Sequence, residues 1–169
     1  MNKRVRQYLG LLSAVSAYYL IHEGAHLVYA LLIGTFRQIN FLGLGVQIDV
    51  YAEKMTDMQL GLFCLAGPMA TVTTAWLLTA FTGVVVQAKS KVFRACMYYI
   101  TIAMLFLDPV YLCGIYKLVG GGDMNGIALL VPEGAVRIVC SALLVAHVVL
   151  FAKWIFPKYK RSYERGEGQ

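Results

Sequence analysis

Charged side chains are scarce in this sequence. Only 14% of its 169 residues are Asp, Glu, Lys or Arg, whereas soluble domains contain about 25%. Hydrophobic residues make up 59% of the chain, and apolar stretches close to the length of a membrane span recur. This composition argues against an ordinary soluble domain. It predicts a single polytopic membrane domain over residues 1–157, in contact with the lipid bilayer.

Acidic residues are the scarcer charged class, which leaves a formal net charge of +6. A basic chain can bind nucleic acid, but here the basic residues flank apolar runs. Membrane topology and anionic lipid explain that placement better, and we expect no nucleic-acid partner. Cysteine is also sparse, and the sequence has no CxxC pair, which argues against a disulfide framework or a cysteine zinc cluster. The four cysteines all lie in apolar runs: Cys64, Cys96, Cys113 and Cys140.

The apolar runs predict an all-α integral membrane protein with about four transmembrane helices. The expected helices cover residues 8–34, 58–86, 92–119 and 135–156. We read the first as an uncleaved span rather than a signal peptide. Apolar residues alternate with polar ones over 46–51, which indicates a strand. After the first helix we therefore expect a short hairpin or re-entrant loop, with an ordinary surface loop as the alternative.

The basic residues also orient the chain. They concentrate at the two ends and in the loop around 87–91, which places both termini in the cytoplasm by the positive-inside rule. Residues 158–169 then form a polar cytoplasmic tail, which we expect to be loose. The connections at 35–57 and 120–134 face outward.

The most informative motif is His22-Glu23-Gly24-Ala25-His26, inside the first apolar run. Two histidines four positions apart project from one face of a helix and can hold a metal, normally zinc. Glu23 can take a proton from a water molecule at that metal. A pair of buried, hydrogen-bonded histidines is the alternative, but three ionisable groups in one turn are costly in lipid without a shared role.

A catalytic zinc usually has three protein ligands, so one is missing. The candidates are Asp108, Asp123 and His147. Asp123 follows three glycines that let the backbone bend inward, whereas Asp108 better matches the depth of the histidines. A lone histidine on an apolar helix, such as His147, is more often a hydrogen-bonded core residue. The residues alone leave the choice between the two acids open.

These motifs resemble the site-2 protease family of intramembrane zinc metalloproteases. The family has HExxH in a first core helix and a Gly-Pro motif in the next, similar to Gly67-Pro68. It takes its third ligand from an Asp in a later segment. That resemblance implies Asp123 as the ligand, with Asp108 as the alternative ligand or a supporting acid. The family often has Asn where Thr71 stands, and here the usual Asn- and Pro-rich segment before the Asp is missing.

We therefore expect a minimal, zinc-dependent intramembrane endopeptidase without a PDZ or other appended module, in a prokaryotic plasma membrane. Its metal ligands are His22, His26 and Asp123, and Glu23 is its catalytic base. Its partner is a transmembrane protein substrate, and the sequence does not indicate an oligomeric state. Two alternatives are an inactive relative that binds membrane segments and a small metal-ion transporter.

Overall fold

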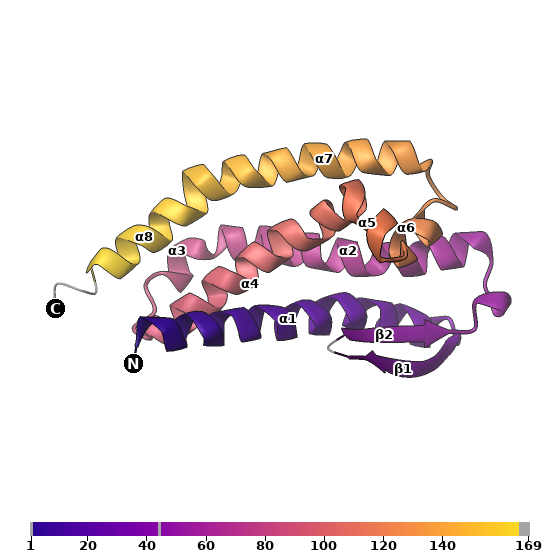
Figure 1. The fold of residues 1–169 in the computed structure, drawn as a ribbon, viewed down its shortest axis with the longest axis horizontal. Helices are drawn as coiled ribbons and strands as arrows, with labels where there is room; N and C mark the ends of the chain where they lie inside the picture. Colours follow the sequence, from indigo (N-terminus) through magenta and orange to yellow (C-terminus); the bar gives the residue numbers. More distant parts are fainter. Residues whose placement is uncertain (1, 44, 166–169) are drawn as a thin grey trace.

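The computed structural model describes residues 2–43 and 45–165, and its long helices lie along one another (Figure 1). The chain begins with α1 (Lys3–Leu32), whose first turn is capped by the Asn2 side chain. A hairpin of β1 (Phe36–Leu42) and β2 (Gly45–Val50) follows, and then the short 3₁₀ turn η1 (Ala52–Lys54).

The second long helix is α2 (Asp57–Ala80), which opens with a capping box between Thr56 and Gln59. It is followed by the short α3 (Thr82–Val85) and by α4 (Lys91–Val110). A π-helical turn η2 (Tyr111–Ile115) and α5 (Tyr116–Val119) continue α4 without a break.

Next come the short α6 (Gly122–Ile127) and the long α7 (Glu133–Leu150). The π-helical turn η3 (Phe151–Ile155) joins α7 to α8 (Phe156–Arg165). The start of α1 and the end of α8 lie at one end of the bundle, and the hairpin and α6 lie toward the other (Figure 1).

The helical prediction is confirmed in its coarser form. Within the described residues, three helical runs are long and apolar enough to cross a membrane: Asp57–Ala80, Lys91–Val119 and Glu133–Glu164. The first helix is not among them, so the count of four spans stays a prediction. Of the shapes expected after that helix, the structure has the hairpin, with Ile39 opposite Ile48 in an antiparallel register.

The prediction of a loose tail from Lys158 was wrong for the part that the structure describes. The helix continues to Arg165 because Tyr159 is only 2% exposed and packs against Tyr98, with ring centroids 4.9 Å apart. Ser162 also donates a hydrogen bond to the Val86 carbonyl at 2.9 Å. Apolar residues at 155, 159 and 163 already follow a helical spacing in the sequence. Residues 166–169 of the predicted tail lie outside the described residues.

His147 has the structural role that the sequence favoured for it. Pro109 has no N–H, so the Leu105 carbonyl one turn earlier loses its helical partner. The His147 ring on α7 replaces that partner, since its Nδ1 lies 2.6 Å from the Leu105 oxygen. Both His147 and Leu105 are fully buried. This bond attaches α7 to α4 and explains a histidine on an apolar helix.

We expect His147→Leu to lower the free energy of unfolding by about 1–3 kcal/mol, because a buried carbonyl loses its donor. In a Pro109→Ala background the restored backbone N–H at position 109 can bond the Leu105 carbonyl, so the same change should cost clearly less. Denaturant unfolding in detergent of the two single variants and the double variant measures this coupling. Equal costs in both backgrounds would show that the histidine does not replace the missing N–H.

Candidate metal centre

The two histidines of the motif lie one turn apart on the face of α1 that points into the bundle. His22 is 5% exposed and His26 is 3% exposed. Their ring centroids are 4.8 Å apart and the rings are nearly perpendicular. Along α1 they separate two apolar clusters, one that includes Ala17 and Ile21 and one that includes Leu27 and Ala30. Polar groups buried at this depth need partners from other helices.

Asp123 reaches the histidines because the chain reverses between α5 and α6. Gly120 and Gly121 have φ values of +100° and +65°, a left-handed conformation that other residues adopt only at a cost. The prediction that glycines bend the backbone inward before Asp123 is confirmed. Close packing then holds α6 against α2, since a Cβ added to Gly126 would lie 2.2 Å from the Cys64 sulfur.

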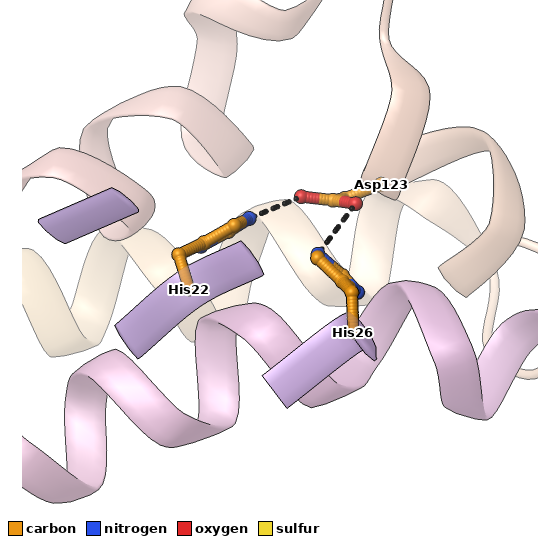
Figure 2. A group of neighbouring side chains, drawn as sticks. All are labelled: His22, His26 and Asp123. Carbon is orange, nitrogen blue, oxygen red and sulfur yellow. Dashed lines mark hydrogen bonds and ion pairs between the residues drawn. The ribbon is translucent and has the colours of Figure 1, made fainter. Parts of the chain in front are cut away.

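The carboxylate of Asp123 faces both imidazoles (Figure 2). Its Oδ2 lies 3.1 Å from His22 Nε2, and its Oδ1 lies 3.4 Å from His26 Nε2. Bonds of about 2.0–2.1 Å to a tetrahedral zinc place neighbouring ligand atoms about 3.3 Å apart. One donor atom from each of the three residues lies within 4.8 Å of the others. The spacing therefore fits three ligands of one metal ion.

The other ring nitrogen of each histidine is already engaged. His26 Nδ1 donates to the Phe63 carbonyl at 2.7 Å, and His22 Nδ1 lies 3.3 Å from the Asp108 carboxylate. These bonds put the proton of each neutral ring on Nδ1 and leave a lone pair on each Nε2. Those lone pairs point at the Asp123 oxygens, so acceptors face acceptors. A cation among them, either a metal ion or an added proton, removes this repulsion.

Gly67 keeps the space in front of the two histidines open. A Cβ added there would lie 2.5 Å from His26 Nε2 and 2.7 Å from His22 Nε2. Both distances are below 3.0 Å, so the added atom would clash with the two nitrogens and reach into the space in front of them where a shared ion would lie. The Gly-Pro pair of α2 thus has a local physical reason, and its glycine belongs to the candidate centre.

Asp108 lies behind His22, on the opposite edge of the ring from Asp123. It is 1% exposed and accepts a hydrogen bond from the Tyr18 hydroxyl at 2.7 Å. The Thr71 hydroxyl also donates to it. The structure thus groups Asp123 with the two imidazole Nε2 atoms and puts Asp108 among the groups that orient His22. Depth along the helices favoured Asp108 as the ligand, but depth does not tell which edge of a ring an acid approaches.

Glu23 lies at the edge of a cleft of about 640 Å³ that His26, Asp123 and the whole of β2 also line. Its Oε2 accepts a hydrogen bond from the Ile48 backbone N–H at 3.1 Å. The hairpin therefore holds the carboxylate that the sequence assigned as the base. Oε2 of Glu23 makes this contact, which leaves Oε1 available to accept a proton.

The remaining sequence candidate lies elsewhere. His147 bonds to Leu105 as described and takes no part in the centre. Sequence reasoning missed Tyr18, although its position four residues before His22 placed it on the same helix face. It also missed the Phe63 carbonyl, for which no signal exists, since any residue type supplies a carbonyl.

No known protein family, curated protein or solved structure was found to match the chain. The interpretation of the centre therefore depends on the geometry of its own residues.

We expect Gly67→Ala to abolish zinc binding, because the added methyl group takes the space between the two Nε2 atoms. Gly24→Ala is the matched control, since an added Cβ there has no atom within 4 Å. Metal analysis of both purified variants should find zinc at about the wild-type ratio in Gly24→Ala alone. A Gly67→Ala protein with full zinc content would contradict the geometry.

The two acids should differ in the same assay. Asp123→Ala removes a ligand and is expected to leave almost no zinc. Asp108→Ala removes a partner of His22 and should weaken zinc affinity by roughly 10–100-fold. Competition with a chelator of known affinity measures both. The reverse order would assign the ligand role to Asp108.

Proposed function

We propose that the protein is an intramembrane zinc metalloprotease that hydrolyses a peptide bond in or near a transmembrane segment of a membrane-protein substrate. The observation that carries this proposal is the convergence of His22, His26 and Asp123, with Glu23 at the edge of the same cleft. Two ligands come from one helix and the third from the start of the short helix α6, inside a bundle of apolar helices.

The setting supports a membrane protein with four spans. Alongside the three apolar runs, α1 is 30 residues long and measures about 45 Å, enough to cross a bilayer. Its outer face exposes large apolar side chains, including Leu12 at 65%, Leu20 at 76% and Leu32 at 80%. Polar residues of the candidate centre lower its mean hydropathy. The start of α1 and the end of α8 lie at the same end of the bundle (Figure 1), as four crossings require, and the basic residues there favour the cytoplasmic side.

Each residue of the centre has a task in peptide hydrolysis. Zinc held by the three ligands would supply a Lewis acid that polarises the scissile carbonyl and acidifies water. Glu23 takes the proton of the attacking water at its free oxygen and returns it to the nitrogen of the leaving amine. The Ile48 N–H keeps that carboxylate in place. Asp108 and the Phe63 carbonyl hold the two imidazoles in the orientation that ligation needs.

The hairpin offers a place for the substrate backbone. The Tyr51 N–H bonds to the Thr35 carbonyl on the β1 side, while the Ile48 N–H points the other way, to Glu23. Because successive strand amides alternate in direction, those of Val46 and Val50 also face the cleft. A transmembrane helix must unwind before it is cut, and an unwound segment can pair as an added strand with the Val46 and Val50 amides on either side of Ile48.

Glu23→Gln is the variant that tests this function. It keeps the shape of the side chain but cannot accept the proton, so we expect full zinc content and a loss of cleavage of at least about 100-fold. The assay uses proteoliposomes that contain a panel of single-span peptides with a central helix break. Mass spectrometry then detects new peptide termini. A chelator should abolish wild-type cleavage, and added zinc should restore it.

Three outcomes separate the alternatives. Unchanged cleavage in Glu23→Gln would refute the proposed chemistry. Bound zinc without cleavage of any peptide, together with saturable binding of one of them, would favour an inactive protein that binds membrane segments. Zinc uptake into proteoliposomes that carry the wild-type protein would favour a transporter.

A further inference from the structure

A second cavity lies at the opposite end of the bundle from the hairpin. It has a volume of about 310 Å³ and lies among the start of α1, the start of α4 and the last helix, α8. Lys3 is 19 residues before His22, about 28 Å along α1, so this cavity is separate from the candidate metal centre. Its basic lining residues are Lys3, Arg6 and Lys160, and its aromatic ones include Tyr98, Tyr99, Tyr159 and Tyr163.

The charges around this cavity are not balanced within the described residues. Glu164 is the one acid that lines it, against three basic residues, and its 3.9 Å contact with Lys160 is a long pair between two exposed side chains that leaves Lys160 able to bind an anion. Arg6 is half-buried, which weakens the compensation that water provides. The lining thus has a net charge of about +2 and attracts an anion.

A buried arginine next to the cavity adds to the imbalance. Arg94 is 7% exposed, and its guanidinium stacks over Tyr163, 5.4 Å from the ring centroid. One nitrogen donates to the Ala88 carbonyl, and Nε has no hydrogen-bond partner among the described residues. None of the ion pairs among the described residues includes Arg94. A buried guanidinium without an anion is costly, so a negative group nearby offsets that cost.

We propose that this cavity binds the phosphate of an anionic phospholipid from the leaflet at this end of the bundle. Lysine and arginine are the side chains that recognise phosphate oxygens. Tyrosines beside them are typical of the depth at which headgroups lie. Phe156 in the lining is 46% exposed, and Val5 and Leu9, on the same stretch of α1 as Arg6, are 45% and 39% exposed, which gives acyl chains an apolar surface to follow. A free phosphate ion has no apolar part and would gain nothing from contact with that surface.

A lipid in this place would join elements that are far apart in the sequence. Arg6 belongs to the first helix and Lys160 to the last, so one phosphate between them reduces the repulsion between the two ends of the chain. Bound lipid would therefore stabilise α8 against α1 and α4. This role needs only the membrane setting and does not depend on the proposed peptidase chemistry.

The test is lipid binding by the full chain in detergent, measured by native mass spectrometry with phosphatidylglycerol, phosphatidylcholine and inorganic phosphate as separate probes. We expect the wild-type protein to bind phosphatidylglycerol at least about 10-fold more tightly than phosphatidylcholine. Replacing Arg6 and Lys160 by Gln together should weaken phosphatidylglycerol binding by roughly 30-fold, since two cations near the headgroup are lost. The affinity for phosphatidylcholine should hardly change.

Arg4→Gln with Lys153→Gln is the matched control. Both residues are exposed and basic, and neither lines the cavity. We expect this double variant to keep phosphatidylglycerol affinity within about threefold of the wild type. Both double variants should retain the wild-type circular dichroism spectrum, which separates lost lipid binding from lost folding and does not depend on whether the protein binds zinc.

Three results would overturn the proposal. Equal losses in the two double variants would show a diffuse basic surface rather than a site. Equal affinities for the two lipids would remove the selectivity for an anionic headgroup. Inorganic phosphate that binds as tightly as phosphatidylglycerol, with the same loss in the Arg6/Lys160 variant, would assign the cavity to a free anion.

Discussion

The arrangement of the bundle depends on three acceptor groups that meet beside the cleft, two of them on histidine rings that are almost fully buried. One oxygen of the Asp123 carboxylate lies 3.1 Å from His22 Nε2, and the other lies 3.4 Å from His26 Nε2. Such a cluster is stable only around a positive charge. The other polar contacts of the region then have one function in common, because they fix the rings so that their lone pairs keep pointing at the same place.

Small residues on α2 make this meeting geometrically possible. Gly61 contacts Leu130, Cys64 contacts Gly126, and Gly67 faces both histidine rings. Side chains of ordinary size at these positions would push α6 and its carboxylate away from α1. In membranes, close approach of helices depends on such small residues rather than on burial of apolar area, since lipid is as apolar as the core. The same small residues of α2 therefore allow both the apolar packing and the polar centre.

Much of this could be predicted from local pattern. Apolar runs predicted the long helices, alternation predicted the strand at 46–51, and the glycines before Asp123 predicted the inward turn. The location of Asp108 and Asp123 around His22 could not be derived from the residues alone, although the family resemblance implied Asp123 as the ligand, because a sequence gives depth along a helix but not the edge of a ring that a group approaches. The Phe63 carbonyl could not be found either. The helical tail was missed although Tyr159 and Tyr163 continue a helical spacing.

One turn of α4 connects the centre to the rest of the bundle. Leu105 accepts the hydrogen bond from His147 on α7, and Asp108 accepts those from Tyr18 on α1 and Thr71 on α2. Pro109, next to Asp108, is the reason that the Leu105 carbonyl is free to bond outside its own helix. A displacement of α7 would therefore remove the partner of that carbonyl in the turn that carries Asp108. The same turn of α4 therefore holds the outermost long helix through Leu105 and orients His22 of the candidate metal centre through Asp108.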